Sequence, residues 1–310
     1  MSFAADVRAG LSRDPKRLPP RWFYDDLGSR LFGAICALPW YRVTRAELGL
    51  LTGASRVVRR RMGKPGLVVE LGCGAGEKLA LLLDGLLGPR ERTRVALVDV
   101  SREALALTAS RLAVRGGLSV QTFRADYRVG LGSALLQRTR GPTLVVFLGS
   151  NLGNFDPPQA RRFLTRIRRA LRPGDGLLLG ADLVKPEADL VLAYDDPLGV
   201  TASFNKNLLR RMNDELGASF DLDSFRHHAL WDARRSRVEM HLVSRVPQSV
   251  EVPGARLTAR FRRGETIFTE ASYKYTESGL RSALGDAGFP CECSWIDEKA
   301  RFALSFFRVP

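Results

Sequence analysis

Apolar and polar positions follow two different patterns along the chain, and the middle of the chain has the simpler one. From about residue 67 to residue 182, short apolar runs are separated by segments whose apolar residues recur at helical spacing. The apolar runs predict buried strands at 67–71, 94–100, 119–125, 143–149 and 176–182. The segments between them predict helices at 78–87, 101–114 and 157–171. This alternation is typical of an α/β fold with a parallel, doubly wound sheet.

The regions on either side have a different texture. The segment before residue 67 is predicted to be helical. Beyond residue 182, helical segments at 187–217 precede stretches with strand character, and these lie at 238–246, 255–261 and 265–275. A helix near 277–287 leads to two last strands. We therefore expect a doubly wound core at 47–182 that is completed by 273–310, and a second, α+β domain assembled from 1–46 and 183–272.

A glycine-rich loop closes the first predicted strand and opens a helix. It reads Glu70-Leu71-Gly72-Cys73-Gly74-Ala75-Gly76, and its glycines permit a sharp turn and a close approach of the backbone to a ligand. Asp99 ends the second strand, where an acid can bind ribose hydroxyls, and Asp126-Tyr127 follows the third, where adenine usually lies. A tight turn without a ligand is the simpler alternative for the loop alone.

The whole pattern favours S-adenosylmethionine over a nicotinamide dinucleotide. A dinucleotide oxidoreductase would favour G-x-G-x-x-G, whereas the residue at the last of those glycine positions is Glu77. The acidic E-L-G-C-G-x-G loop instead resembles the signature of class I methyltransferases.

The fourth predicted strand ends in the turn Gly149-Ser150-Asn151-Leu152-Gly153-Asn154, at the sheet edge where doubly wound proteins bind ligands. The next residues, Asp156-Pro157-Pro158, are similar to the D-P-P-Y box of adenine N-methyltransferases. However, residue 159 is Gln and not the aromatic that would stack on a flipped base, and the prolines fit better at a helix start. Asn154 is either a turn former or a ligand for a small polar molecule, and the spacing leaves both interpretations open.

The net charge of +15 raises the question of nucleic-acid binding. The arginine clusters include Arg161-Arg162 and Arg168-Arg169, which alternate with Phe163, Leu164 and Ile167 as on an amphipathic helix. A solvated helix face explains this pattern, and charge alone indicates association and not fold. We expect no specific nucleic-acid partner.

Composition also limits the compartment and the chemistry. No run reaches the ~18 consecutive apolar residues of a membrane span, and the N-terminal segment lacks the apolar region of a secretory signal. The 4 cysteines are scattered, and Cys291 and Cys293 have no His or Cys neighbours that would complete a zinc site. We expect a reduced, cytoplasmic protein without a metal and without membrane association.

Longer motifs occur in order along nearly the whole chain. They include Leu38-Pro39-Trp40-Tyr41, Leu179-Gly180-Ala181-Asp182-Leu183-Val184-Lys185, Ala193-Tyr194-Asp195-Asp196, Phe220-Asp221-Leu222-Asp223, Val238-Glu239-Met240 and Thr269-Glu270-Ala271-Ser272-Tyr273-Lys274. Together with the glycine loop and the turn after the fourth strand, they resemble the histidine Nα-methyltransferases of ergothioneine biosynthesis. The resemblance implies an enzyme with a class I methyltransferase core and a substrate-binding α+β domain. Such an enzyme trimethylates the α-amine of L-histidine to hercynine.

The resemblance implies one set of residues for the substrate. This set consists of Tyr41, Gly149, Asn154, Tyr194, Met240, Glu270 and Ser272. Asn154 and Tyr194 would hold the carboxylate of the histidine. Glu270 and Ser272 would hydrogen-bond its imidazole, Tyr41 would close over the ring, and Met240 would form a wall of its pocket.

A second set is implied for S-adenosylmethionine. It consists of Tyr24, Gly72, Lys78, Asp99, Asp126 and Tyr127. Tyr24 would also lie near the reacting amine, as Gly149 would near the transferring methyl, and Tyr24 is the expected catalytic residue. Tyr127 stands where Phe is common in the family.

The chemistry of the ring favours histidine over other amino acids. An imidazole offers a donor and an acceptor that a carboxylate and a hydroxyl can match, and Glu270 and Ser272 share one face of an extended strand. An α-N-methyltransferase of the tryptophan type is the alternative, although an indole has no second ring nitrogen to compensate a buried carboxylate. A nucleic-acid methyltransferase is less favoured. By residue type alone, Tyr41 and Met240 could be core residues and Glu270 an exposed one. We expect a monomer.

Overall fold

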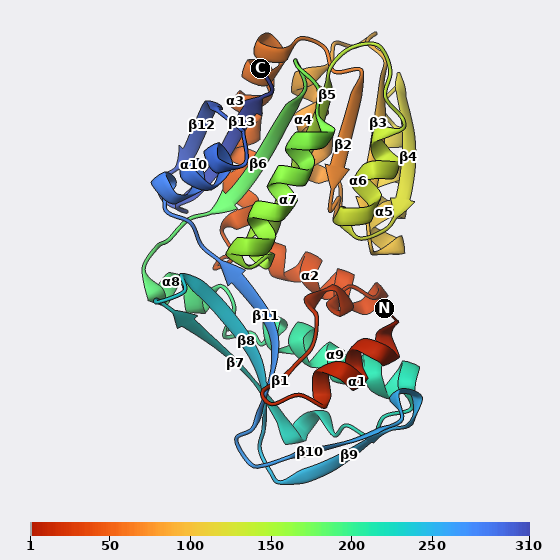
Figure 1. Cartoon of the computed structure of the whole chain (residues 1–310), viewed down its shortest axis with the longest axis vertical. Helices are drawn as coiled ribbons and strands as arrows, with labels where there is room; N and C mark the ends of the chain where they lie inside the picture. The colour runs from red at the N-terminus through yellow and green to blue at the C-terminus, as the bar shows by residue number, and fades with distance from the viewer. Residues whose placement is uncertain (1) are drawn as a thin grey trace. The chain divides into compact units, whose positions relative to one another are not determined.

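The computed structural model describes residues 2–310, and the chain forms two compact units (Figure 1). The first, here called the core unit, comprises Arg42–Lys185 and Tyr273–Pro310. The second, here called the accessory unit, comprises the chain up to Tyr41 together with Pro186–Ser272. Each unit is therefore built from segments that are far apart in the sequence.

The core unit contains a 7-stranded sheet with the order β12-β13-β6-β5-β2-β3-β4. Its strands are β2 (Leu67–Leu71), β3 (Thr93–Asp99), β4 (Leu118–Arg124), β5 (Thr143–Phe147), β6 (Gly176–Asp182), β12 (Cys291–Asp297) and β13 (Phe302–Arg308). Strands β2 to β6 are parallel. Strand β13 is antiparallel to both β12 and β6, because the C-terminal segment joins the sheet as a hairpin and not through a crossover helix.

Helices cover both faces of this sheet, so the predicted doubly wound α/β class is confirmed. The helices of the core unit are α3 (Val43–Met62), α4 (Glu77–Leu86), α5 (Arg102–Ala113), α6 (Tyr127–Leu135), η2 (Asn151–Asn154), α7 (Pro157–Ala170) and α10 (Glu277–Asp286). Helices α3, α4 and α5 share one apolar cluster with the sheet, and α6, α7 and α10 share the other. Neighbouring strand residues divide between the clusters, as Val68 and Val69 do, because side chains alternate along a strand.

One strand differs from the prediction in its surroundings. The segment 119–125 was expected to form a buried strand, and β4 does form there, but each of its residues is either half-buried or exposed. The physical reason is its place at the edge of the sheet, where only β3 pairs with it.

Helix α6 was not predicted. Its sequence contains Gly130 and Gly132, which lower helix propensity. At Gly130 a Cβ atom would lie 2.2 Å from Cγ1 of Val98. The glycine that weakens the helix signal is thus what allows α6 to pack closely against β3.

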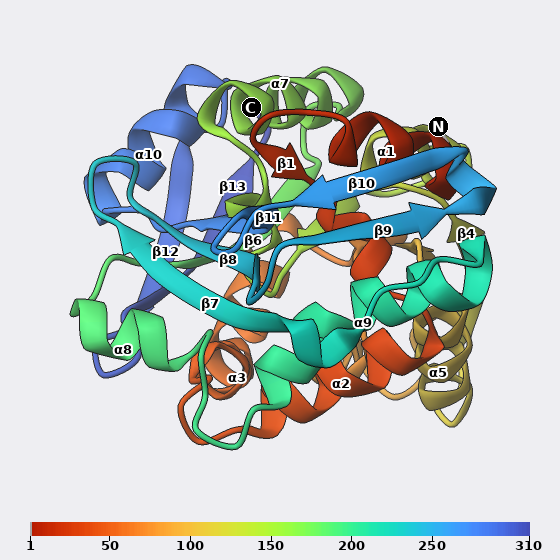
Figure 2. The same ribbon diagram turned by 90° about the horizontal axis from the view of Figure 1, so that it is seen from below.

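The accessory unit contains a 4-stranded sheet with the order β1-β11-β8-β7 and a separate 2-stranded sheet of β9 and β10 (Figure 2). The strands are β1 (Lys16–Arg17), β7 (Phe225–Asp232), β8 (Arg237–Ser244), β9 (Gln248–Val252), β10 (Leu257–Phe261) and β11 (Thr266–Tyr273). The helices are α1 (Phe3–Leu11), η1 (Pro20–Phe23), α2 (Asp26–Ala37), α8 (Glu187–Leu192), α9 (Val200–Leu216), η3 (Leu222–Ser224) and η4 (Pro253–Ala255). No helix among residues 2–310 combines the length and the apolar character that a membrane crossing requires.

The start of α2 is tied to α9 through one side chain. The carboxylate of Asp25 accepts a hydrogen bond from the backbone N–H of Gly28 at 2.7 Å and so caps α2. The same oxygen accepts from Nδ2 of Asn207 at 2.8 Å. This bond fixes the segment that begins at Tyr24 against the second half of the accessory unit.

Candidate functional site

The glycine loop of the core unit leaves β2 and enters α4. Its glycines Gly72, Gly74 and Gly76 have φ angles of 84°, 51° and 75°, where other residues are strained. A Cβ at Gly72 would lie 2.8 Å from Nδ2 of Asn151 and 2.9 Å from the hydroxyl of Tyr127. A Cβ at Gly74 would meet nothing within 4 Å. The loop therefore packs tightly at Gly72 and presents bare backbone at Gly74.

Asp99 ends β3 beside this loop. Its carboxylate accepts hydrogen bonds from the backbone N–H groups of Ser101 at 2.8 Å and of Gly74 at 3.5 Å. Burial raises the pKa of Asp99, and these N–H groups act against that rise. The acid lies at the carboxyl edge of the sheet and is connected directly to the loop.

Glu70, near the end of β2, is a buried acid to which the sequence analysis gave no role of its own. Its Oε2 atom is buried and has no hydrogen-bond partner. Burial raises the pKa of Glu70 well above its ordinary value, Lys78 lowers it, and Asp99 and Glu47 add to the rise. An unpartnered carboxylate oxygen beside a bare glycine loop suits a ligand that carries a cationic group.

Asp126 and Tyr127 stand at the start of α6. Asp126 caps the helix by accepting from the backbone N–H of Arg128 at 3.0 Å, and it also pairs with the guanidinium of Arg128 at 2.9 Å. The ring of Tyr127 packs against Phe147 and Phe163 with centroid distances of 5.3 and 6.4 Å. Burial raises the pKa of the Tyr127 hydroxyl, so this residue provides a neutral aromatic surface.

The turn after β5 has an unusual backbone. Gly149 and Ser150 both have positive φ angles, of 73° and 60°, and Ser150 is not a residue that adopts this conformation without cost. The Oγ of Ser150 accepts from the backbone N–H of Asp182 at 2.9 Å. The short helix η2 follows and ends at Asn154, which is partly exposed.

The N–H of Gly149 points to an acid that the sequence analysis missed. It donates to the carboxylate of Glu47 on α3, with a distance of 2.8 Å to Oε2. Oε2 of Glu47 also lies 2.7 Å from Nζ of Lys78. Glu47 is completely buried, and a Glu within an amphipathic helix gave no signal of this.

In the accessory unit, one face of the sheet gathers predicted substrate residues. Tyr194 packs against an apolar cluster that includes Ala229 and Val238. Met240, two residues after Val238 on β8, is buried and points to that same face. The hydroxyl of Tyr194 donates to Oγ of Ser272 at 2.8 Å, which places Ser272 on the same face too.

Strand β11 carries two of the predicted substrate residues, Glu270 and Ser272. Phe268 lies on the opposite face, where its ring centroid is 5.4 Å from that of His241. Regular alternation would place residues 268 and 272 on one face, but Ser272 lies on the other. Thr269 and Glu270, which lie between these two residues, are both buried. Glu270 lies two positions before Ser272 and, like Ser272, is buried.

Aromatic rings connect the two predicted tyrosines near the N-terminus. Tyr24 lies edge-on to Phe32 at a centroid distance of 5.6 Å, and Phe32 lies edge-on to Tyr41 at 6.3 Å. The ring of Tyr41 in turn lies 6.5 Å from that of Tyr194. Tyr24, Tyr41 and Tyr194 therefore belong to one aromatic group.

His227 holds the backbone of Tyr194 in place. The Nε2 atom of His227 lies 2.8 Å from the carbonyl oxygen of Tyr194, and Nδ1 lies 2.9 Å from Nδ2 of Asn205. Because the Asn205 amide nitrogen only donates, Nδ1 accepts and Nε2 carries the proton. Burial lowers the pKa of His227, which keeps the ring neutral.

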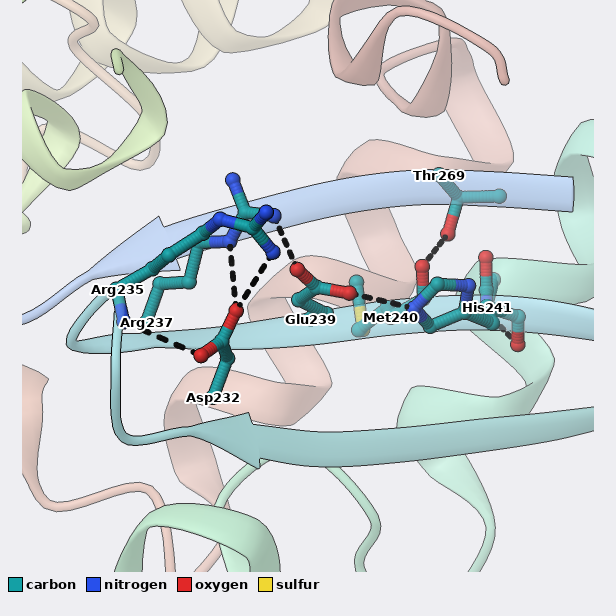
Figure 3. A network of polar contacts seen from close by, with 8 residues as sticks. Asp232, Arg235, Arg237, Glu239, Met240, His241 and Thr269 are labelled. Carbon is teal, nitrogen blue, oxygen red and sulfur yellow. Dashed lines mark hydrogen bonds and ion pairs between the residues drawn. The ribbon is translucent and has the colours of Figure 1, made fainter. Parts of the chain in front are cut away.

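The face of β8 opposite to Met240 carries a network of charges (Figure 3). The carboxylate of Glu239 forms an ion pair with Arg237. Its Oε2 atom lies 2.9 Å from Nε2 of His241. Next to the network, Oγ1 of Thr269 on β11 donates to the backbone carbonyl oxygen of Met240 at 2.9 Å. These contacts stabilise the strand that carries Met240.

The predicted site residues thus fall into two groups. The core unit holds Gly72, Lys78, Asp99, Asp126, Tyr127, Gly149 and Asn154. The accessory unit holds Tyr24, Tyr41, Tyr194, Met240, Glu270 and Ser272. Nowhere in residues 2–310 do three or more His, Cys, Asp or Glu residues come together in a way that could hold a metal ion.

Comparison with known proteins reveals relatives that match nearly the whole chain. The model of a family described as histidine-specific methyltransferase, SAM-dependent, matches residues 3–309. A histidine N-alpha-methyltransferase of Mycobacterium tuberculosis is 41% identical over 306 residues, which covers 98% of this chain and 94% of that protein. The protein of the same name from Mycolicibacterium smegmatis is 41% identical over 301 residues, or 97% of this chain and 92% of the relative. Ergothioneine biosynthesis protein 1 of Schizosaccharomyces pombe is 28% identical over 285 residues, or 88% of this chain and 36% of that protein.

Proposed function

The chain belongs to the family of histidine-specific, S-adenosylmethionine-dependent methyltransferases, and on that premise we propose that it converts L-histidine to hercynine by three methylations of the α-amine. Each transfer converts one S-adenosylmethionine to S-adenosylhomocysteine. The proposal places the reaction in ergothioneine biosynthesis, the process that the name of the Schizosaccharomyces pombe relative states for that protein.

The observation that carries the choice of substrate is the buried pair of Glu270 and Ser272. Their exposed fractions are 7% and 4%, and the hydroxyl of Tyr194 donates to Oγ of Ser272 at 2.8 Å. A carboxylate and a hydroxyl can pair with both nitrogens of an imidazole. A phenyl or indole ring would leave a buried polar group without that partner, which disfavours such substrates strongly.

We assign Gly72, Lys78, Asp99, Asp126 and Tyr127 to the cofactor. The bare backbone at Gly74, the carboxylate of Asp99 and the orphaned oxygen of Glu70 support this assignment, because they suit ribose hydroxyls and a cationic group. When bound, S-adenosylmethionine supplies an electrophilic methyl group on a positively charged sulfur. Lys78 would hold a carboxylate, and Tyr127 would present its ring to adenine.

The main task of the site residues is to align the neutral amine with the methyl group. Deprotonating the amine is the lesser task. The α-amine of a free amino acid is less basic than a lysine side chain, so water can take the proton. Alignment of the reactants then supplies most of the rate enhancement. We assign the positioning of the amine to the hydroxyl of Tyr24, which is held in the aromatic group of the accessory unit. A neutral hydroxyl tolerates an amine that already carries methyl groups better than a charged residue would.

The experiment that tests the proposal is incubation with S-adenosylmethionine and each of the twenty amino acids, analysed by mass. We expect a gain of three methyl groups on the α-nitrogen of histidine. Binding of S-adenosylhomocysteine, measured by calorimetry, should be severely weakened in Asp99→Ala. Efficient methylation of another amino acid with histidine left unmodified would overturn the substrate and leave the cofactor assignment standing.

Three further expectations belong to the same proposal: a cytoplasmic enzyme, a monomer, and a reaction without a metal. The described cysteines Cys36, Cys73, Cys291 and Cys293 are all free thiols, which supports a reducing compartment. Light scattering coupled to gel filtration would test the monomer. Activity that persists in excess chelator would support the metal-free reaction, and its loss would refute it.

A further inference from the structure

We propose that Glu47 is a positioning residue. It couples Lys78, the cationic residue assigned to the cofactor, to the Gly149 turn. The inference rests on the proposed function only for the identity of the ligands at these two residues. Glu47 comes from α3, far from the glycine loop and from the β5 turn in the sequence, and no motif in the sequence analysis included it as a site residue.

The contacts of Glu47 join two residues that are assigned to different ligands. Its Oε2 lies 2.7 Å from Nζ of Lys78 and accepts from the N–H of Gly149 at 2.8 Å. Its Oε1 lies 3.1 Å from the same N–H. The side chain of Glu47 is 0% exposed, whereas that of Lys78 is 20% exposed.

A carboxylate removed completely from water is costly unless charge and hydrogen bonds compensate it. At Glu47 the compensation comes from one ammonium and one backbone amide together. If the carboxylate moved, the ammonium of Lys78 and the N–H of Gly149 would both lose their interaction with it. The position of the Lys78 ammonium and the position of the Gly149 turn are therefore not independent.

The carboxylate of Glu47 has room because Gly180 on β6 carries no side chain. A Cβ at Gly180 on β6 would lie 1.8 Å from Oε1 of Glu47. The Cζ atom of Phe302 on β13 would lie at 3.0 Å, so the carboxylate of Glu47 is the much closer obstacle to a side chain at this position. This contact also offers a way to displace Glu47 without changing any charge.

The Gly149 turn needs such an anchor. Gly149 and Ser150 hold successive left-handed conformations, which for Ser150 is a strained state that the surroundings must enforce. The N–H of Asp182 holds Ser150 on one side, and Glu47 holds Gly149 on the other. We therefore expect Glu47 to set where Gly149 stands against the reacting groups.

The test compares Glu47→Gln and Gly180→Ala with a control that has the same chemistry elsewhere. Asp175 is also a buried carboxylate that binds backbone amides, those of Thr143 at 2.7 Å and Arg172 at 2.9 Å. It contacts none of the site residues, so Asp175→Asn should reduce thermal stability but leave turnover and S-adenosylhomocysteine affinity within about twofold of the parent.

For both Glu47→Gln and Gly180→Ala, kcat should fall about tenfold or more and the Kd for S-adenosylhomocysteine should rise about fivefold to tenfold. The KM for histidine should stay within about twofold, because Glu270 and Ser272 are untouched. Hydrogen exchange of the peptide that contains Gly149 should accelerate in both variants without any ligand. The double variant should be no worse than the poorer single one, since both changes displace the same carboxylate.

If Glu47→Gln behaves like Asp175→Asn, losing stability alone, Glu47 is merely structural and the inference is wrong. The same holds if Gly180→Ala leaves turnover, cofactor affinity and exchange unchanged. The exchange and binding measurements need no substrate. They decide about Glu47 even if histidine proves not to be the amine that is methylated, which keeps a failure of this inference distinct from a failure of the proposed function.

Discussion

At the scale of single residues, burial forces polar side chains into definite hydrogen-bonding states, and His227 is a clear case. Its side chain is 2% exposed, and burial, the largest cause, lowers its pKa below the ordinary 6.5, although the carboxylate of Asp195 acts in the opposite direction. The neutral ring donates to Tyr194 and accepts from Asn205. A protonated ring would place a second donor against the Asn205 amide, so protonation and the observed geometry are incompatible.

We therefore predict that the contribution of His227 to stability depends on pH. The unfolded chain binds the proton at a higher pH than the folded chain, so the contribution is complete above about pH 6.5 and is lost as the pH falls through the folded-state pKa. At pH 8, His227→Gln should cost about 1–3 kcal/mol of unfolding free energy. Thermal unfolding of both proteins between pH 8 and pH 5 should show the difference shrinking at low pH. A difference that is constant or that grows at low pH would contradict the assigned ring state.

Glu270 is the residue on which substrate choice depends. Removing its carboxylate would leave a ring N–H of histidine unpaired, at a cost of about 1–3 kcal/mol. We predict that Glu270→Ala raises the KM for histidine about tenfold or more, while calorimetry shows the affinity for S-adenosylhomocysteine preserved. Glu270→Gln, which keeps an acceptor, should be affected less. Glu251→Ala on the exposed side of β9 serves as the control. An unchanged KM in Glu270→Ala would remove Glu270 from the substrate pocket.

At the scale of elements, the sequence predicts what is local and repeated. The apolar runs of β2, β5 and β6 and the amphipathic pattern of α7 give strands and helices close to the observed bounds. The position of Asp99 beside the glycine loop could be predicted too, because a βαβ unit fixes which strand end meets which loop. These features could be predicted because neighbouring residues determine them.

Other features depend on contacts that no local pattern contains. The exposure of β4 follows from its place at the sheet edge, and α6 is specified by the space beside Val98 more than by propensity. Glu270 and Ser272 were expected to share one face of a strand, but the bond between Ser272 and Tyr194 joins segments that are far apart in the sequence. Glu47 was missed for the same reason, since its partners come from α4 and the β5 turn. The role of such a buried polar residue can be recognised only from the folded structure, because its partners come from other elements.

At the scale of the whole molecule, the excess of basic residues needs an explanation that fits the fold. The chain has 48 Lys and Arg residues against 33 Asp and Glu residues, so ion pairs cannot neutralise all of the cations. On α7, Arg161, Arg162 and Arg166 are exposed, while Phe163 and Ile167 of the same helix are buried in the core. The arginines of this helix therefore form its solvent face, and the aromatic ring among them is not available to stack on a base.

We predict that DNA and RNA bind this protein only through this general charge. The Kd should be about 10⁻⁴ to 10⁻⁶ M at physiological salt, and binding should weaken steeply as salt increases, without preference for sequence. Fluorescence anisotropy with two unrelated oligonucleotides at two salt concentrations measures both properties. Replacing Arg161, Arg162 and Arg166 together with Gln should flatten the salt dependence and leave histidine turnover unchanged, because α7 presents these residues to solvent and not to the glycine loop. A sequence-selective complex that survives physiological salt, or a methylated nucleic acid, would show instead that the charge serves recognition and that a nucleic acid is the substrate to examine.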